Sequence, residues 1–535
     1  MSTAFSMALD SLGEETSAAR PRGDSRARAG AGVSPAGSFH LSQVARASQA
    51  ARAENPLFPD PAYESSEGVA DVLSAIRDGH GIIFVSGRAG TGKSRLIRYL
   101  GRMPGGRRQV VAAPTGIAAL SLGASTIHTL FRLPVGVIDT ASLDPAEVAG
   151  MPVLRRMTRL VIDEVSMVRA DVMDAIDLRL RQARDTDIPF GGVQVVLVGD
   201  FLQLPPVVTP EDRRLLDRLG YTTPFAFSAR VLRTAPVRMA VLTRVFRQKD
   251  PDMVRVLGDI REGRRVRRAL DWLNARCARP HRTGVAPMIV TATRAAAARA
   301  NAVGLARVRA APGRARAEAV FEARASGIFE NACTPTPAPR HLEIVEGMRV
   351  MAVRNDPAGR FANGSLGIVE GVDQGTSGRT EPSVIVRFDR CAEAVRVHPV
   401  EWSRVRQVWD ERARRIVESP IGVYRQVPLV VGYAITIHKS QGLTLEDVRL
   451  DLGRGTFAPG QLYVALSRAT SVEGLSFARP LEPRDVMVDE MLVQFLHWAA
   501  SAPNLDIPHR EASWHDSPWI RDDVGREVGW SPAPV

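Results

Sequence analysis

Short apolar runs that end in polar residues recur along the first half of the chain. The runs cover residues 81–85, 110–113, 160–162 and 195–198, and the helical stretches between them include 94–100 and 170–184. Continuous apolar runs of this length are typical of parallel strands buried on both faces, and their alternation with helices predicts βαβ units. The pattern therefore indicates a doubly wound α/β core, with its ligand site at the carboxyl ends of the strands.

A second series of apolar runs predicts a second α/β lobe. Its strands are expected at residues 288–291, 448–452 and 475–477, with a helix near 460–469. The intervening residues 343–405 differ, because glycines separate short β runs there. The glycines are Gly347, Gly364, Gly367 and Gly371, and the runs cover 349–353, 367–369 and 384–388. Such spacing favours a small β-barrel inserted in the second lobe.

These patterns divide the chain into six segments. We expect a disordered arm (1–60), a first lobe (61–235), the first part of a second lobe (236–342), the β-barrel (343–420), the second part of the second lobe (421–490) and a tail (491–535). The arm lacks bulk and periodicity, and its acidic residues argue against an organelle transit peptide. No apolar run approaches the roughly 18 residues of a membrane span, so we expect a soluble protein.

Composition indicates what kind of partner the protein binds and which redox compartment it occupies. The formal net charge of +12 favours a polyanionic partner such as nucleic acid or an acidic membrane surface, although arginine enrichment without a partner would give the same sum. Cys277, Cys333 and Cys391 form no CxxC pair, which predicts no disulfide framework and no zinc site and fits a reducing compartment. Because nearly every basic residue is arginine, we expect a bacterial type of GC-rich genome and a cytoplasmic, nucleoid-associated protein.

The rare lysines mark candidate chemistry, since Lys93, Lys249 and Lys439 are the only three in the chain. Lys93 closes the sequence GRAGTGKS, between a predicted strand and a predicted helix. Backbone N–H groups of such a loop point at phosphate oxygens, and the helix N-terminus adds its dipole. Lys93 is expected to reach the β- and γ-phosphates of a nucleotide, and Ser94 to ligate Mg²⁺. The binding residues are Gly87, Ala89, Gly90, Thr91, Gly92, Lys93 and Ser94.

Two adjacent acids, Asp163 and Glu164, follow the apolar run at 160–162. Acids there could simply begin a helix, but a phosphate loop upstream favours a catalytic role. We expect Asp163 in the magnesium shell and Glu164 as the group that polarises an attacking water. Phosphoryl transfer also needs positive charge, which arginines from another lobe can supply, but no single arginine stands out in this chain.

Several motifs occur in an informative order. They are GRAGTGKS (87–94), APTGIAA (113–119), TIHTLF (126–131), LVIDEVSMV (160–168), PFGGVQVVLVGDFLQLPPV (189–207), LTRVFRQ (242–248), NGSLG (363–367), AITIHKSQG (434–442) and YVALSRA (463–469). As an ordered set over residues 66–480 they resemble the Pif-type DNA helicases, of the RecD-like branch of superfamily-one helicases. GDFLQLPP and TIHKSQG are the most specific of them.

The resemblance implies two RecA-like P-loop NTPase lobes that hold ATP between them and move 5′ to 3′ on single-stranded DNA to unwind tailed duplexes. It implies that Gln203 senses the γ-phosphate and that Arg247 and Arg468 are arginine fingers. Residues implied to touch the strand, or to couple it to ATP, are Pro114, Thr115, Gly116, Thr126, His128, Asn363, Thr436, His438, Lys439, Ser440 and Gln441. Roles in DNA repair, recombination and telomere maintenance are implied by the resemblance alone.

Two alternative functions stay open. The same residues fit a DNA-stimulated ATPase that translocates without unwinding, or a remodeller of RNA–DNA hybrids, because backbone-tracking grooves tolerate any base. Such helicases usually carry an adenine-reading glutamine shortly before the phosphate loop, and residues 61–76 contain none, so nucleotide specificity is undecided. The residues themselves show neither a direction of movement nor an obligate protein partner.

Overall fold

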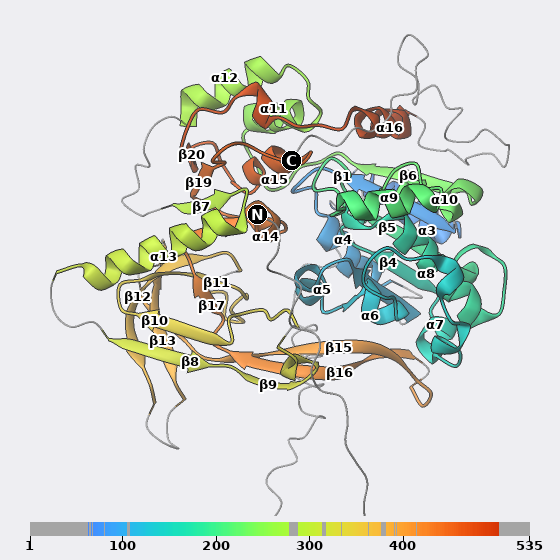
Figure 1. Cartoon of the computed structure of the whole chain (residues 1–535), viewed down its shortest axis with the longest axis horizontal. Coiled ribbons are helices and arrows are strands. Elements are labelled where there is room, and N and C mark those ends of the chain that lie inside the picture. The colour runs from blue at the N-terminus through green and yellow to red at the C-terminus, as the bar shows by residue number, and fades with distance from the viewer. Residues whose placement is uncertain are drawn as a thin grey trace, which may run out of the picture. The chain divides into compact units, whose positions relative to one another are not determined.

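The computed structural model describes most of residues 63–501 (Figure 1). Within that range it leaves out 64–65, 67, 80, 104–107, 278–286, 313–316, 333, 362, 376–380, 390, 392 and 414. The expected arm at 1–60, the tail from residue 502 and Cys333 lie outside the described residues. Among the described helices, none is long and apolar enough to cross a membrane.

The first lobe is built on a six-stranded parallel sheet with the order β3-β2-β4-β5-β1-β6. The strands are β1 (Ile82–Gly87), β2 (Gln109–Ala113), β3 (Ser125–Thr126), β4 (Arg159–Ile162), β5 (Gln194–Gly199) and β6 (Val237–Leu242). The helices are α3 (Val69–Arg77), α4 (Lys93–Leu100), α5 (Gly116–Leu122), α6 (Ile127–Phe131), α7 (Pro152–Arg156), α8 (Ala170–Arg184), α9 (Pro210–Arg218) and α10 (Arg230–Thr234). The four strands predicted from apolar runs are confirmed as β1, β2, β4 and β5.

Both faces of this sheet are covered, which explains why its strands are apolar throughout. Successive side chains of a strand point to opposite faces. Phe84 of β1 therefore packs in the core that contains α8, whereas Ile83 and Val85 pack in the core that contains α3 and α4. The polar residues that follow each strand are left at one edge of the sheet.

The first lobe continues beyond the boundary expected at residue 235. β6 pairs in parallel with β1, from Ile82 opposite Val237 to Gly87 opposite Leu242. This strand was missed because its partner lies far away in the sequence, so no local pattern assigns it to the first sheet. The expected boundary between residues 235 and 236 is therefore wrong.

The second lobe has a four-stranded parallel sheet with the order β18-β7-β19-β20. Its strands are β7 (Met288–Thr291), β18 (Ala434–Thr436), β19 (Val448–Asp451) and β20 (Leu475–Phe477). Its helices are α11 (Pro251–Arg261), α12 (Val266–Cys277), α13 (Arg294–Ala310), α14 (Ile437–Ser440) and α15 (Gln461–Leu466). The three predicted strands of this lobe are confirmed as β7, β19 and β20.

A β module is inserted between α13 and β18. A five-stranded antiparallel sheet and the β8–β10 pair enclose one core, to which Phe321, Ile344 and Val386 belong. The strands are β8 (Glu318–Glu322), β9 (Arg324–Gly327), β10 (His341–Val345), β11 (Arg349–Ala352), β12 (Leu366–Asp373), β13 (Ser383–Phe388), β14 (Val395–Val397), β15 (Val400–Asp410), β16 (Arg415–Gln426) and β17 (Leu429–Val431). The expected limits, 343–420, were too narrow, because β8 and β9 find their partners only in the folded module.

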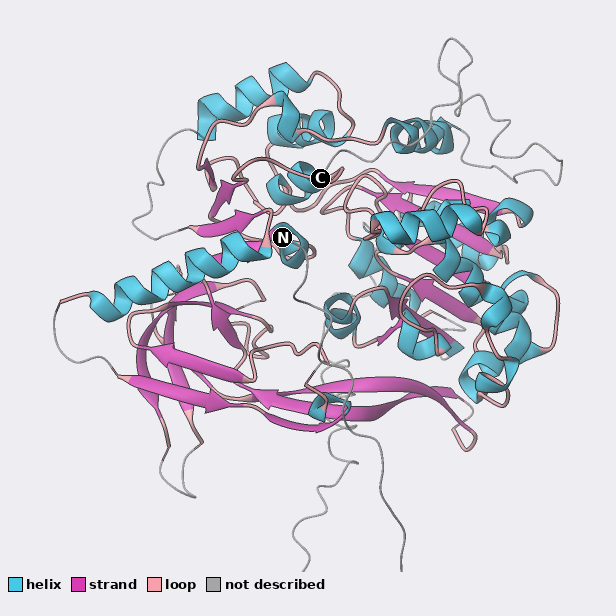
Figure 2. Cartoon of the chain, viewed as in Figure 1, coloured by secondary structure: helices cyan, strands magenta, loops and turns pink. Residues whose placement is uncertain are grey.

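Strands β15 and β16 form a long hairpin that extends from the β module along the first lobe (Figure 2). The Ser125 hydroxyl of β3 donates a hydrogen bond of 2.9 Å to the carbonyl of Val405. Farther out, the Trp409 ring lies 5.5 Å from the guanidinium carbon of Arg108 and 5.4 Å from that of Arg156. The hairpin therefore joins the inserted module to the first lobe through both a backbone carbonyl and a side chain.

The chain returns to the first lobe through a last helix, α16 (Glu490–Ser501). Leu492 and Leu496 are buried in the first-lobe core, and the ring of Phe495 stacks on Phe227 with centroids 5.0 Å apart. Residues 491–501 therefore belong to this helix, and the predicted start of the tail at residue 491 is wrong. An apolar residue every third or fourth position buries one face of this helix.

Candidate nucleotide site and its link to the strand-contacting segments

The phosphate loop joins the carboxyl end of β1 to the first turn of α4, as predicted. Gly90 and Gly92 have φ angles of 81° and 86°, a left-handed conformation that glycine adopts without steric cost. A Cβ atom on Gly90 would lie 2.6 Å from Cβ of Arg247. Glycine at this position thus permits the segment that leads into the second lobe to approach the loop.

Lys93 lies in this loop with its ammonium group enclosed. Its Nζ donates to the carbonyl oxygens of Gly87, at 2.7 Å, and of Arg88, at 3.0 Å. Burial lowers the pKa of Lys93, while the carboxylates of Asp200, Glu164 and Asp163 favour the charged form. The ammonium group therefore stands among carbonyl and carboxylate oxygens at the base of the loop.

Asp163 and Glu164 come directly after β4 and next to this lysine. Asp163 Oδ1 accepts a hydrogen bond of 2.9 Å from the Glu164 amide. Burial, and then the neighbouring charge of Glu164, raise the pKa of Asp163 to about 7. Two carboxylates so close together would be stabilised by a cation, and carboxylate and hydroxyl oxygens are the ligands that Mg²⁺ prefers. Asp163 and Ser94 therefore fit a magnesium site.

Both arginines implied by the resemblance lie close to Glu164, whose charge favours their protonated forms. Arg247 Nη1 donates to the carbonyl oxygen of Ser467 at 3.1 Å. Arg468 is 2% exposed and its Nε donates to the carbonyl of Val464 at 2.8 Å. Burial, and then the charge of Arg247, lower the pKa of Arg468. Residues from distant motifs thus converge on one charged site.

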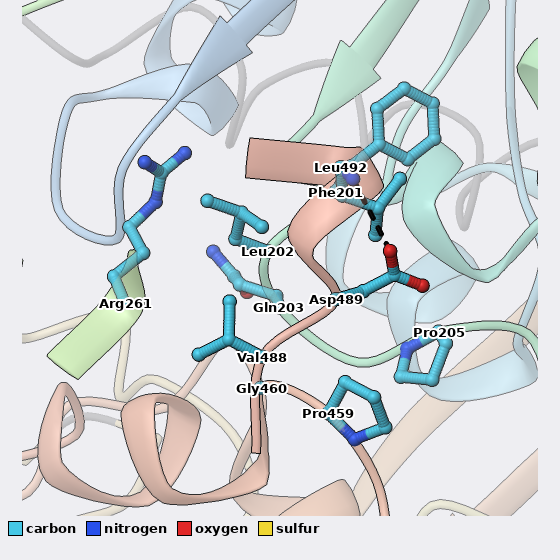
Figure 3. A pocket seen from close by; sticks show the side chains of 10 residues that line it. All are labelled: Phe201, Leu202, Gln203, Pro205, Arg261, Pro459, Gly460, Val488, Asp489 and Leu492. Carbon is cyan, nitrogen blue, oxygen red and sulfur yellow. Dashed lines mark hydrogen bonds between the residues drawn. The ribbon is translucent and has the colours of Figure 1, made fainter. Parts of the chain in front are cut away.

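Gln203 lies in the loop that follows β5, within a pocket where the two lobes meet α16 (Figure 3). Its amide donates to the carbonyl of Asp200 at 2.9 Å, and its side-chain Nε2 lies 3.4 Å from Asp200 Oδ2. Gln203 is 3% exposed. The loop of residues 200–203 is therefore held by its own first residue.

In the segments expected to touch a nucleic-acid strand, some side chains cap helices and others are exposed. Thr126 and Thr436 cap α6 and α14, accepting hydrogen bonds of 3.3 Å from the amides of Thr129 and Lys439. Lys439 itself is exposed. Burial, and then Arg169 and Arg294 respectively, lower the pKa values of His128 and His438. Both histidines are therefore biased towards their neutral forms.

The remaining members of this set lie on three different segments: residues 114–116, Ser440 of α14 and Asn363 of the β module. Thr115 accepts a hydrogen bond of 3.2 Å from the amide of Ala118 in the first turn of α5, which begins at Gly116 and follows Pro114. The buried Ser440 donates to the carbonyl of Ile437 at 2.7 Å. Asn363 is exposed on the β module. The fold thus gives Thr115 and Ser440 local structural bonds and leaves Asn363 accessible.

Gln441 departs from the rest of this set. Its Nε2 donates a hydrogen bond of 3.0 Å to Oε2 of Glu164. The motif TIHKSQG thus reaches the nucleotide site through its glutamine, while its lysine faces solvent. A single short segment therefore contacts the candidate catalytic carboxylate and presents a cation at the surface.

Comparisons with known proteins agree with this arrangement. A family model described as PIF1-like helicase matches residues 64–255. ATP-dependent DNA helicase PIF1 of Homo sapiens is 34% identical over 447 residues, 82% of this chain and 64% of that protein. ATP-dependent DNA helicase Pif1 of Bdellovibrio bacteriovorus is 31% identical over 445 residues, 82% of this chain and 93% of that protein. The chain belongs to the PIF1-like helicase family.

Solved structures of Pif1 from Bacteroides sp share the fold. At 33% identity they cover 82% of this chain and 97% of theirs, with TM-scores of 0.71 for the complex with ADP-AlF4 and 0.58 for the form bound to ssDNA. The expected RecA-like lobes are thereby confirmed. The chain spans less than two thirds of the length of its human relative but nearly all of its bacterial one.

Sequence reasoning missed three residues of the site. Tyr463 of α15 accepts a hydrogen bond of 2.9 Å from the amide of Ala89, inside the phosphate loop. Asp200 and Arg261 form a buried ion pair between the two lobes. Asp200 and Tyr463 stand within quoted motifs and could have been found there. Arg261 carries no signal in a chain so rich in arginine.

An aromatic pair lies beside the phosphate loop. The Tyr63 hydroxyl donates to the carbonyl of Gly92 at 3.1 Å, and its ring centroid lies 6.2 Å from that of Phe246. The guanidinium of Arg95 lies over the Tyr63 ring at 4.4 Å. Phe246 is 42% exposed. Tyr63 is buried, so the exposed aromatic surface of this pair beside the phosphate loop belongs to Phe246.

Proposed function

We propose that the chain is an ATP-dependent DNA helicase, which hydrolyses ATP, moves along single-stranded DNA and unwinds tailed duplexes. The observation that carries the proposal is the hydrogen bond from Gln441 to Glu164, because it joins a segment expected to contact the strand to the expected catalytic carboxylate. The human and Bdellovibrio relatives are named ATP-dependent DNA helicases, and the Bacteroides structures contain ADP-AlF4 or ssDNA.

In the proposed reaction a water attacks the γ-phosphorus of ATP and the bond to the leaving ADP breaks. Glu164 accepts a hydrogen bond from that water and orients it. Lys93, Arg247 and Arg468 place positive charge against the phosphate oxygens, where negative charge is spread in the transition state. Because the arginines come from beyond the first lobe, hydrolysis requires the two lobes to be together.

Asp163 and Ser94 would hold Mg²⁺ in this site. The buried carboxylate of Asp163, with its raised pKa, is a group whose charged form a divalent cation would stabilise. When bound, Mg²⁺ supplies positive charge to the β- and γ-phosphates. Gln203 is proposed to contact the γ-phosphate.

Movement from 5′ to 3′ and unwinding are proposed from the resemblance of the motifs, with Lys439 and Asn363 as contacts to the strand. A role at the bacterial nucleoid, in repair, recombination or telomere maintenance, is proposed from the same resemblance.

The second candidate is a translocating ATPase that does not unwind, because the nucleotide site accounts for hydrolysis but not for strand separation. Remodelling of RNA–DNA hybrids would use the same backbone contacts.

Matched duplexes with a 5′ or a 3′ single-stranded tail test the proposal. We expect ATP-dependent displacement from the 5′-tailed duplex only, and none when Lys93 is replaced. Strand-stimulated hydrolysis without displacement from either substrate would select the translocating ATPase. Faster displacement of an RNA strand than of a DNA strand of equal sequence would select the hybrid remodeller.

A further inference from the structure

The carboxyl end of α11 holds two buried charges of opposite sign. Arg261 is 7% and Glu262 is 9% exposed. The helix ends there, because Gly263 follows with a φ angle of 66° and turns the chain away. The charged partners of this pair lie mainly on other elements, among them two loops of the first lobe. Buried charges are stable only when they are paired.

Arg261 holds the loop that carries Gln203. Its Nη2 lies 2.6 Å from Asp200 Oδ1 and its Nε lies 3.2 Å from Oδ2, a two-point contact. Asp200 has no exposed surface. Burial works to raise the pKa of Asp200, but the charge and hydrogen bonds of Arg261 more than offset it, so the pKa is lowered. The first residue of the Gln203 loop is thereby tied to the second lobe.

Glu262 holds the phosphate loop. Its Oε1 accepts a hydrogen bond of 3.1 Å from Nη2 of Arg88, the residue whose carbonyl receives the Lys93 ammonium. Arg88 lies directly on α11, since a Cβ atom on Gly258 would come within 2.9 Å of its Nη1. Oε2 of Glu262 lies 3.4 Å from Nε2 of His497 in α16. One carboxylate therefore meets the phosphate loop and the last helix.

We propose that Arg261 and Glu262 are positioning residues that transmit the state of the nucleotide to the second lobe. Neither residue is proposed to touch the nucleotide. A phosphate that shifts the phosphate loop or the Gln203 loop must carry Arg88 or Asp200 with it. Asp200 and Arg261 are both buried and cannot be left unpaired. Glu262 also pairs with Arg264 at 2.7 Å, so its link to the phosphate loop depends on Arg88, which packs directly on α11. Through these two links α11 follows, and with it the lobe that bears the TIHKSQG segment. This inference rests on the proposed function.

Linkage between nucleotide and strand binding tests the relay. The affinity for a fluorescent single-stranded DNA is measured with and without a non-hydrolysable ATP analogue, and the ratio of the two affinities is the coupling factor. We expect Glu262→Gln and Arg88→Gln each to reduce that factor at least about fivefold, the lower end of typical coupling. Affinity for DNA without nucleotide should change less than about twofold.

A matched control lies on the same helix end. Arg265 pairs with Asp259 of α11 itself, at 2.9 Å, and among the described residues it forms no hydrogen bond or ion pair with the first lobe. Arg265→Gln should leave the coupling factor unchanged. The double variant Arg88→Gln/Glu262→Gln should lose no more coupling than either single variant, because the two side chains act as one pair.

The buried pair needs its own control for folding. Arg261→Gln alone leaves Asp200 charged and buried, so the variant is also made with Asp200→Asn, and the folding of both is checked by thermal unfolding. We expect the double variant to fold and to lose coupling about fivefold or more. Full coupling in folded Glu262→Gln, Arg88→Gln and Asp200→Asn/Arg261→Gln would overturn the relay alone. A wild-type protein that binds no single-stranded DNA would instead overturn the proposed function.

Discussion

At the residue scale, the two motif lysines have opposite surroundings. Lys93 is enclosed and donates to two carbonyl oxygens of its own loop, whereas Lys439 is exposed within the short helix α14. A compact ammonium fits the enclosed site as a point charge, and a planar guanidinium does not. The exposed site sets no such limit, so the same substitution should have different results at the two positions.

Lys93→Arg is therefore expected to abolish hydrolysis while the strand is still bound. The guanidinium cannot replace the ammonium among the carbonyls of Gly87 and Arg88 without displacing the loop. Steady-state ATPase rates and binding of fluorescent single-stranded DNA measure the two effects. An ATPase rate of this variant within tenfold of wild type would show that the loop accommodates a guanidinium, contrary to this prediction.

Lys439→Arg should be partly tolerated, because an exposed guanidinium can still reach a phosphate. Lys439→Ala should reduce the stimulation of ATPase by single strands several-fold and the basal rate much less. Basal and strand-stimulated rates of both variants, measured at low salt, give the answer. Equal loss of both rates in the alanine variant would place Lys439 in the nucleotide site instead of the strand path.

Glu164→Gln removes the carboxylate that is expected to orient the water and keeps the shape that Gln441 contacts. We expect hydrolysis to fall by about 10²–10⁴-fold, the usual contribution of a positioned general base, with ATP and DNA binding retained. Single-turnover kinetics separate the chemical step from binding. Near-normal turnover would remove Glu164 from the mechanism.

At the element scale, the β15–β16 hairpin contacts the first lobe through Trp409, which lies between the guanidinium groups of Arg108 and Arg156, and through the carbonyl of Val405. Each contact of the Trp409 ring with a guanidinium contributes roughly 0.5–2 kcal/mol. Trp409→Ala should therefore raise the population of the undocked hairpin about tenfold. Amide hydrogen exchange should increase in residues 400–426 and stay unchanged in the five-stranded sheet of the β module. Arg412→Ala, at the exposed end of the hairpin, is the control and should change neither.

At the scale of the whole molecule, the net charge of +12 should appear as a salt dependence of DNA binding. The logarithm of affinity for single strands should fall linearly with the logarithm of salt concentration, with a slope near −0.7 for each phosphate neutralised. Deleting residues 1–60 should change that slope by less than about one unit. A change of several units would make the arm a nucleic-acid contact, contrary to our expectation.

The sequence alone was sufficient for whatever depends on neighbours along the chain. The phosphate loop, the acid pair after β4 and most strands of the two parallel sheets were predictable, because apolar runs and turn residues report local structure and burial. The ordered motifs predicted the family. The roles of Arg247, Arg468 and Gln203 were predicted only from that resemblance. No local sequence pattern distinguishes a catalytic arginine or glutamine from any other.

Only the tertiary structure decided which distant residues meet. The pairing of β6 with β1, the return of α16 to the first lobe, and the strands β8 and β9 of the β module depend on partners far away in sequence. The same holds for Gln441 beside Glu164 and for Arg261 beside Asp200. Contacts of this kind form when folding closes long loops, and their energies reside in burial and ion pairing that no local pattern records.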